Sequence, residues 1–447
     1  MDGSDENGST TGERGAGDDV TTKEKTPSVD TESGDGADPT PAALAERVRA
    51  GDLRLYELES HADADTATAA RRRLVGSHEH SAFDGPASAL ETVGDYSFPA
   101  SAAEPNIENM TGAVQIPAGV VGPVEIHGDQ LTGERYVPMA TTEGALLASV
   151  NRGCATIDRA GGATARVLDA GMSRAPVFRV DGVAEAKALV AWASDNEDRL
   201  RSAAESTTSH GELESITPYV VGNNVFLRFT YDTKDAMGMN MATIATGEAC
   251  DVVEAETDAD LIALSGNLCT DKKPAAIDAI EGRGRTVAAD VTLPRAVVTE
   301  TLDTTPEAVA EINTRKNHVG SAKAGSLGFN AHVANTVAAI FLATGQDAAQ
   351  VVEGANAITT AEVVDGDLYT SVTLASLEVG TVGGGTKLPT QSEGLDVLGV
   401  RGGGDPPGAN ADALAEATAV AALAGELSLL SALASRNLSD AHAQLGR

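Results

Sequence analysis

The chain is poor in positive charge, and in lysine most of all. Among its 447 residues, 32 Lys and Arg stand against 66 Asp and Glu, which gives a formal net charge of −34, and only nine residues are lysines. So negative a field repels nucleic acid and anionic membrane surfaces, which are therefore poor partners. The charge is typical of a halophilic protein, because salt at about 1 M shortens the Debye length to roughly 3 Å and weakens self-repulsion. An acidic protein from a low-salt cell is the alternative.

Aromatic residues, cysteines and long apolar runs are also scarce. Aromatics make up 3% of the chain and hydrophobic residues 42%, so the core must be packed mostly with Ala, Val, Leu and Ile. The three cysteines, Cys154, Cys250 and Cys269, lack the even number and CxxC spacing of a disulfide framework or a zinc site. The N-terminus has no apolar signal segment, and no stretch reaches the ~20 uncharged apolar residues of a membrane helix. We therefore expect a cytoplasmic protein in a reducing compartment, without a metal site.

Changes in composition divide the chain into five predicted parts, in line with more than one ordinary domain. They are a disordered acidic tail, an N-terminal helical region, a large domain in two pieces, a small domain inserted between those pieces, and a C-terminal helix with a mobile tail. Their predicted ranges are 1–38, 39–105, 106–174 with 263–424, 175–262, and 425–447. The fold class is α/β with mixed α+β character. In the small domain, strand-like VFRV and NNVFLRFTY alternate with helix-like segments, which suggests βαβ units.

Four helical segments can be read from local signals. PTPAALAERVRAG predicts a short capped helix ended by Gly51, and residues 53–82 continue as helix. TTEGALLASVNRGCATIDRAGG predicts a helix capped by Thr141 or Thr142. FNAHVANTVAAIFLATG, from Phe329, is apolar nearly all round and predicts the buried central helix of the large domain. No GxGxxG lies inside a clear βαβ unit, so a Rossmann fold is not supported.

The segment SGNLCTDKKPAAIDAIEGRG carries the strongest chemical signal. Lys272 and Lys273 stand side by side in a chain with nine lysines. A lysine doublet is usually a solvated turn, but a halophilic surface prefers Asp and Glu. A lysine held near carboxylates can polarise a carbonyl oxygen and stabilise an oxyanion.

Other candidate residues are ambiguous when taken singly. Glu143 is either a first-turn carboxylate favoured by a helix dipole or a proton donor in an apolar pocket. Asp347 reads as a turn residue, and His442 as a solvated tail residue of the right type to protonate a leaving thiolate. Asp235 is a predicted N-cap, and the helix start near Gly238 could approach a diphosphate. GTVGGGTK at 380–387 could do the same.

Nine segments make the chain resemble the hydroxymethylglutaryl-CoA (HMG-CoA) reductase family, class I, the eukaryotic and archaeal type. In the family's order they are ENMTG, PMATTEG, NRGC, DAMGMNM, SGN-CTDKKPAAI-EGRG, FNAH-AN, GQDAAQ, GTVGGGT and LAGELSL. Any one could arise by chance, but nine in order could not.

The resemblance implies the catalytic roles. Lys272 would stabilise the thioester and hemithioacetal oxygen, and Glu143 would deliver a proton to the substrate oxygen. Asp347 would couple to both, and His442 would protonate the departing CoA thiolate.

It also implies binding roles. The hydroxymethylglutaryl group would be held by Arg174, Ser265, Lys273, Lys316 and Asn335. CoA would contact Tyr56, Ser149, Asn151 and Arg152. The nicotinamide cofactor would lie on Asp235, Met237, Gly238, Met239 and Asn240, with Gly383, Gly384 and Gly385 nearby. His332 stands in the motif of the active-site helix.

The resemblance further implies the reaction and assembly. HMG-CoA would be reduced to mevalonate and CoA in two steps by two molecules of NADPH, on an inserted ferredoxin-like cofactor domain. The protein would be a homodimer or a dimer of dimers, with sites at the subunit interface and ENMTG at the contact. Ser209 stands where many relatives carry an arginine against the 2′-phosphate, so Lys234 is considered as its substitute, and NADH is the less favoured cofactor.

Two other functions are weighed. A thiolase-type transferase or CoA-thioester lyase would need a nucleophilic cysteine, for which Cys269 beside Lys272 is the candidate. A non-catalytic acidic binding protein would keep the fold without the chemistry. The joint presence of Glu143, Lys272, Asp347 and His442 argues against it.

Overall fold

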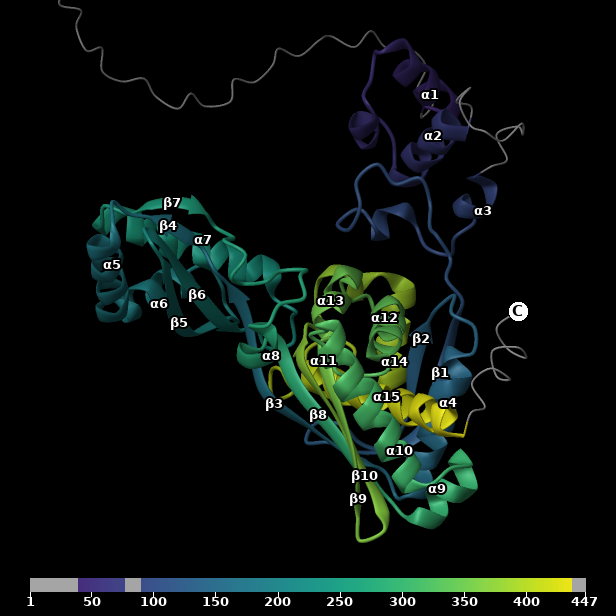
Figure 1. The fold of residues 1–447 in the computed structure, drawn as a ribbon. Helices are drawn as coiled ribbons and strands as arrows, with labels where there is room; N and C mark the ends of the chain where they lie inside the picture. Colours follow the sequence, from purple (N-terminus) through teal and green to yellow (C-terminus); the bar gives the residue numbers. More distant parts are fainter. Residues whose placement is uncertain (1–38, 77–89, 436–447) are drawn as a thin grey trace, which may run out of the picture.

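The computed structural model describes residues 39–76 and 90–435. The predicted tail over 1–38 and His442 lie outside this range. Figure 1 shows an N-terminal helical region and a small domain, each joined to a large domain. The mixed α/β class is confirmed, with ten strands in the connected sheet of the described residues.

The N-terminal region is built on α1 (Pro41–Ala50) and α2 (Ala64–Gly76). The Thr40 hydroxyl caps α1, and Gly51 ends it with a φ of +83°, so this helix forms as its sequence predicts. The predicted continuous helix over 53–82 is wrong, because a 3₁₀ helix (Leu55–Ser60) stands before α2.

The sheet of the large domain has the strand order β2-β1-β3-β8-β10-β9. All its neighbouring strands are antiparallel except β1 and β3. The strands are β1 (Ala118–His127), β2 (Thr132–Ala140), β3 (Ala163–Arg174), β8 (Gly284–Leu293), β9 (Ala357–Val364) and β10 (Asp367–Leu377).

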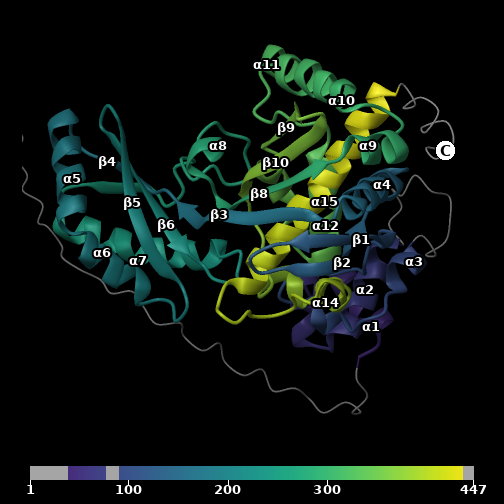
Figure 2. The same ribbon diagram turned by 90° about the horizontal axis from the view of Figure 1, so that it is seen from below.

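The central helix of the large domain is α15 (Ala409–Ala434), not the helix predicted from Phe329. Almost every side chain of α15 is buried, and it lies against the sheet through the middle of the domain (Figure 2). The predicted helix is α12 (Val333–Thr344), shorter than expected and packed against α15. Because α15 runs without a break through residue 425, the predicted start of a separate C-terminal part falls inside a helix.

Among the described residues, α15 is long and apolar enough to cross a membrane by length and composition. Its most apolar window is 83% buried inside the molecule, as expected for a core helix.

Helix α4 (Leu146–Arg159) also packs on α15. The predicted cap is wrong, because α4 begins after Ala145 without a side-chain cap and Thr141 and Thr142 lie in the preceding loop. Further short helices are α3 (Glu91–Gly94), α8 (Asp278–Glu281), α9 (Arg295–Leu302), α10 (Pro306–Ile312), a π-helix (Asn313–Gly320), α11 (Ser321–Ala324), α13 (Val351–Gly354) and α14 (Pro389–Leu398).

The small domain has its own hydrophobic core around Phe178, Phe229 and Tyr231. Its strands pair in the order β7-β4-β6-β5, and every pair is antiparallel. The predicted strand–helix–strand units are therefore present in split form, because β6 lies between β4 and β5, and β4 lies between β6 and β7. The elements follow as β4 (Val177–Arg179), α5 (Val183–Asp195), α6 (Glu197–Glu205), β5 (Glu212–Val221), β6 (Asn224–Asp232), α7 (Met239–Glu256) and β7 (Asp260–Ala263). Strand β3 pairs first with β8 and then with β6, which joins the two domains.

Candidate active site

The lysine pair lies on a tightly wound loop after β7. Asn267, Thr270 and Lys272 all have positive φ angles, of +63°, +58° and +61°. Residues other than glycine take up this conformation only at a cost, so the surrounding contacts must hold the loop. The Thr270 hydroxyl bonds to the carboxyl of Asp278, and the Thr270 carbonyl accepts from the Lys273 N–H at 2.8 Å.

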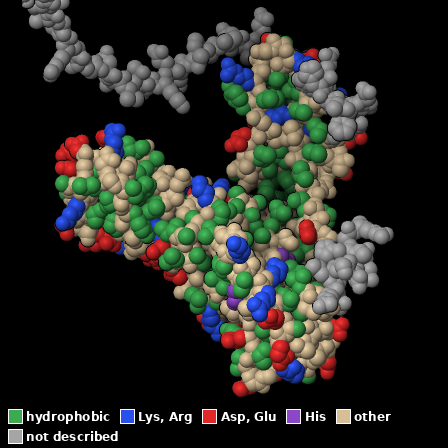
Figure 3. Space-filling model, viewed as in Figure 1, with side chains coloured by type: hydrophobic (Ala, Val, Ile, Leu, Met, Phe, Trp, Pro, Cys, Tyr) green, Lys and Arg blue, Asp and Glu red, His purple; other side chains and the backbone are tan. Residues whose placement is uncertain are grey.

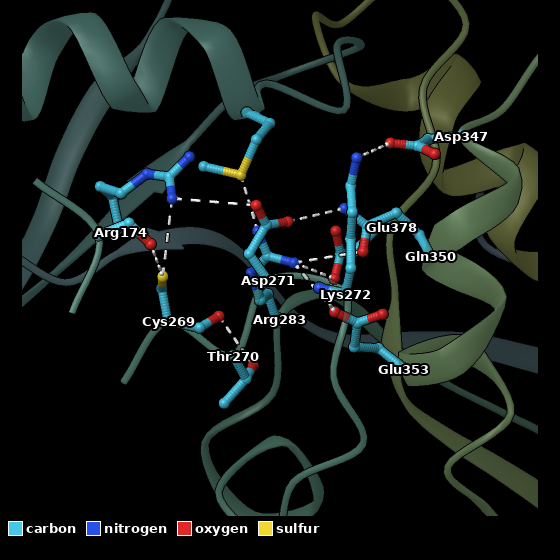
Figure 4. Close-up of polar contacts among 12 residues, drawn as sticks. Arg174, Cys269, Thr270, Asp271, Lys272, Arg283, Asp347, Gln350, Glu353 and Glu378 are labelled. Carbon is cyan, nitrogen blue, oxygen red and sulfur yellow. Dashed lines mark hydrogen bonds and ion pairs between the residues drawn. The ribbon is translucent and has the colours of Figure 1, made fainter. Parts of the chain in front are cut away.

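The side chain of Lys272 points to Asp347, with Nζ 2.9 Å from Oδ2 (Figure 4). The other oxygen of Asp347 accepts the Ala349 N–H at 3.1 Å and caps a 3₁₀ helix (Ala348–Gln350). The hydrogen bond to Asp347 raises the pKa of Lys272 above its ordinary value. The ammonium is therefore charged and oriented, while 47% of the side chain stays exposed.

Lys273 differs from its neighbour. Its ammonium turns back to the carbonyl oxygen of Asp271, at 2.7 Å, and the side chain is exposed. Of the two lysines, Lys272 is thus the one paired with a carboxylate beyond its own loop.

Arg174, at the end of β3, lies beside the same loop. Its guanidinium donates to the Thr243 hydroxyl and lies 3.7 Å from the sulfur of Cys269 and 4.0 Å from the Asp271 carboxylate. Ser265 contacts the Cys269 sulfur at 3.4 Å. Burial disfavours the Cys269 thiolate, but Ser265, nearby backbone N–H groups and Arg174 together lower the pKa of this thiol.

The other predicted catalytic and substrate residues are not joined to Lys272. Glu143 is exposed in the loop before α4 rather than in its first turn, and among the described residues no hydrogen bond or ion pair links it to Lys272 or Asp347. Lys316 is exposed on the π-helix, and Asn335 is half-buried in the first turn of α12. The structure therefore brings together Lys272, Asp347, Arg174 and Ser265, and leaves Glu143, Lys316 and Asn335 on separate elements.

Three of the four predicted CoA residues, Ser149, Asn151 and Arg152, lie on α4. Arg152 donates to the hydroxyl and carbonyl of Ser428 on α15, and Ser149 bonds to the same hydroxyl at 3.0 Å. Asn151 accepts the Gly122 N–H at 2.8 Å. Beside these residues is an open pocket of about 450 Å³, lined by Gly122, Pro123, Asn151, Arg152, Ala155, Asp158 and Arg159. Tyr56 lies in the N-terminal region, 61% exposed.

The two predicted cofactor segments lie side by side. Ala236 forms a parallel bridge with Val382, and the Asp235 carbonyl accepts the Thr381 N–H at 2.8 Å. The predicted N-cap at Asp235 is wrong, because Gly238 is the N-cap of α7. The buried Asp235 carboxylate instead accepts four backbone N–H groups, from Gly404, Gly408, Asn410 and Ala411.

The chain was compared with known proteins. The family model described as hydroxymethylglutaryl-coenzyme A reductase matches residues 67–447. The chain belongs to this family.

Relatives named 3-hydroxy-3-methylglutaryl-coenzyme A reductase are similar over nearly their whole length. That of Haloferax volcanii is 73% identical over 91% of this chain and 99% of its own. That of Halobacterium salinarum is 68% identical over 90% and 98%.

Among solved structures, the class II 3-hydroxy-3-methylglutaryl-CoA reductase of Streptococcus pneumoniae bound to NADPH shares the fold. Its TM-score is 0.61 at 21% identity, over 74% of this chain and 89% of that one.

In this reductase-family chain, sequence reasoning missed a buried network beneath Lys272 (Figure 4). Arg283 contacts Glu378, Glu353 at 3.5 Å and Asp271 at 3.2 Å, and Arg283, Glu353 and Glu378 have no exposed side-chain surface. Each of the three stands among small and apolar residues in QVVEGA, SLEVG and EGRG, a pattern that does not by itself separate a buried charge from an exposed one. Position 284 in EGRG requires glycine, because its φ is +73° and a Cβ there would lie 2.6 Å from the Leu377 carbonyl oxygen.

Within the part of the chain that the structure describes, no group of three or more His, Cys, Asp or Glu side chains is placed to hold a metal ion. Cys154, Cys250 and Cys269 are all buried with free thiols.

Proposed function

We propose that this chain reduces 3-hydroxy-3-methylglutaryl-CoA to mevalonate and CoA with two molecules of NADPH. The observation that carries the proposal is the ion pair of Lys272 with Asp347, at 2.9 Å, on a partly exposed loop beside Arg174. A fixed ammonium is the group that thioester reduction needs, because negative charge develops on the carbonyl oxygen at each hydride transfer.

The four catalytic residues act at different points of the two reduction steps. Lys272 stabilises the oxygen of the thioester, the hemithioacetal and then the aldehyde, and Asp347 keeps its ammonium protonated. Glu143 supplies the proton that the product alcohol requires. His442 protonates the CoA thiolate as it leaves, a step that only the first half of the reaction contains.

The binding residues fall into two groups, according to the part of the substrate that they hold. The hydroxymethylglutaryl group is held by Arg174, Ser265, Lys273, Lys316 and Asn335. His332 stands at the start of α12, the helix that carries Asn335. Tyr56, Ser149, Asn151 and Arg152 hold CoA, which the pocket on α4 supports.

The cofactor lies on the paired segments that contain Gly238 and Gly383. The helix start at Gly238 offers N–H groups to a diphosphate, and no atom stands within 4 Å of a Cβ built at Gly383 or Gly384, so a ligand can approach closely. The NADPH-bound title of the Streptococcus structure supports NADPH as cofactor. Lys234 is a weak substitute for the arginine missing at Ser209, because its ammonium already contacts Asp232 and Glu212.

A homodimer or a dimer of dimers completes the site in this proposal. Glu143 and Lys272 both face outward on separate elements of one chain. Apolar side chains on either side of the ENMTG segment are exposed, namely Ile107 at 48% and Val114 at 84%. A second subunit would cover these side chains and bring its own polar groups to Lys272. A fully active monomer in sedimentation under assay conditions would contradict this part.

Finer assignments belong to the same proposal. The nine ordered motifs support class I, and the Haloferax and Halobacterium relatives support a halophilic source. Three free thiols fit a cytoplasmic enzyme. The order β4-α5-α6-β5-β6-α7-β7 and the sheet order β7-β4-β6-β5 support a ferredoxin-like inserted domain.

The test is oxidation of NADPH that depends on HMG-CoA, followed in high salt by the loss of reduced-nicotinamide absorbance. Lys272→Ala should lower kcat by about 10²–10³-fold, the usual cost of removing an oxyanion-stabilising group, with a smaller change in KM. Cys269→Ala should keep turnover, whereas a thiolase-type enzyme would lose it. If Lys273→Ala is the more damaging substitution, the wrong lysine has been assigned.

A further inference from the structure

The segment that carries Asp347 forms hydrogen bonds with the lysine loop at two more places. Gln350 donates to the Asp271 carboxylate at 3.1 Å. The Glu353 carboxylate accepts the backbone N–H of Lys272 and, at 3.2 Å, that of Lys273. One stretch of seven residues, 347–353, thus holds the lysine loop through a side chain and through its backbone.

The backbone contact matters because Lys272 has a φ of +61°. This conformation persists in a non-glycine residue only when the surroundings enforce it. An acceptor that binds two successive N–H groups fixes the peptide planes on either side of Lys272. The direction in which its side chain leaves the backbone, toward Asp347, is fixed with them.

Glu353 itself forms an ion pair with a buried arginine. It lies 3.5 Å from Arg283, which also contacts Glu378 and Asp271. Burial is the largest influence on the Glu353 carboxyl and raises its pKa, while Arg283 and the two N–H donors oppose that rise. Burial, opposed only in part by Arg283, raises the pKa of Glu378 well above its ordinary range.

We propose that Glu353 is a positioning residue of this enzyme, which orients the Lys272 ammonium by binding the backbone of the lysine loop and is anchored by Arg283. This inference rests on the proposed reductase function. Glu353 touches neither substrate nor cofactor in this scheme, so its effect reaches the reaction only through Lys272.

The test compares Glu353→Ala and Glu353→Gln with the wild type in high salt. Loss of orientation should lower kcat by about 10–10²-fold, as for small misplacements of a catalytic group, while KM for HMG-CoA changes little. Gln keeps a carbonyl oxygen for the two N–H groups, so it should retain more activity than Ala. Equal kcat in Glu353→Ala and the wild type would overturn the proposal.

Glu416 provides a matched control. It is a fully buried glutamate on α15 that accepts the N–H groups of Asp129, Gln130 and Leu131, on the turn between β1 and β2. Glu416→Gln removes the same charge from a similar setting and should leave kcat near the wild-type value at temperatures where the variant is folded. An equal loss of kcat in the two Gln variants would mean that any buried carboxylate matters equally, against the proposal.

A double variant separates positioning from a merely structural role. When Lys272 is already Ala, Glu353→Gln should cause no further loss of kcat, because there is no ammonium left to orient. Additive losses would contradict the proposal. A wild type without HMG-CoA-dependent NADPH oxidation would instead refute the reductase function itself, so the two failures are distinguishable.

Discussion

At the scale of single residues, Asp347 sets the pH up to which Lys272 keeps its proton. Its hydrogen bond raises the pKa of Lys272, so the charged lysine persists to higher pH than an ordinary one. Asp347→Asn should lower that pKa, and the alkaline fall of kcat should then begin at lower pH. The measurement is kcat against pH at saturating substrate. The control is Glu307→Gln, which removes an exposed ion pair between Arg295 on α9 and Glu307 on α10. An unmoved alkaline limb would show that Lys272 does not titrate in that range.

His442 permits a test that separates the two half-reactions. A thiolate leaving group needs an acid, whereas an aldehyde has no leaving group, so His442→Gln should cripple reduction of HMG-CoA and spare reduction of free mevaldehyde. Lys272→Ala should damage both, because both develop charge on oxygen. The rates of the two reactions are measured for each variant. Equal losses in His442→Gln would assign the histidine a structural role.

The motifs predicted which residues belong to the candidate site, but not how the surrounding structure supports them. Lys272 and Asp347 were found through their motifs, and the structure pairs them. Glu353 and Glu378 were missed because a carboxyl among small apolar residues reads equally well as a surface position. Only the packing of α13 against β10 shows that both are buried around Arg283.

At the scale of elements, the crossing of α4 and α15 depends on Gly153. A Cβ at this position would lie 1.9 Å from the Ala424 carbonyl oxygen, so the two helices touch backbone to backbone. Gly153→Ala should destabilise the protein by about 1–3 kcal/mol, as overpacking commonly does. The free energy of unfolding is measured by denaturant titration in high salt.

Gly247 in α7 is the control for that prediction. A Cβ there would lie 3.9 Å from a methyl of Leu264, which is an ordinary van der Waals contact. Gly247→Ala should therefore be neutral or stabilising by up to about 1 kcal/mol, the helix-propensity gain. If Gly153→Ala were equally benign, the close crossing would be wrong.

Local signals predicted some elements well and their places in the fold poorly. Thr40 and Gly51 act within a few residues of α1, so its ends follow from sequence. The choice of central helix does not, because α12 and α15 are both apolar. Two glutamates, Glu416 and Glu426, are buried within α15, and their backbone partners lie far away in the chain.

At the scale of the whole molecule, the formal charge of −34 acts against compactness. Figure 3 shows acidic side chains at the outer end of the small domain and at the far tip of the large one, with basic side chains interspersed. Many basic groups are already paired locally, such as Arg179 with Asp260 and Arg295 with Glu307. The excess of acidic charge is therefore left for dissolved cations to screen.

This excess predicts how stability depends on salt. The Debye length falls from about 10 Å at 0.1 M to about 3 Å at 1 M, so repulsion between acidic groups several ångströms apart is mostly removed within that range. The thermal midpoint should rise steeply as KCl increases up to about 1 M and more gently beyond, where strengthened apolar burial is the remaining effect. Sucrose, which strengthens burial without screening charge, should not reproduce the steep part. A midpoint that rises in proportion to KCl over the whole range, or equally in sucrose, would mean that charge repulsion is not what salt relieves in this protein.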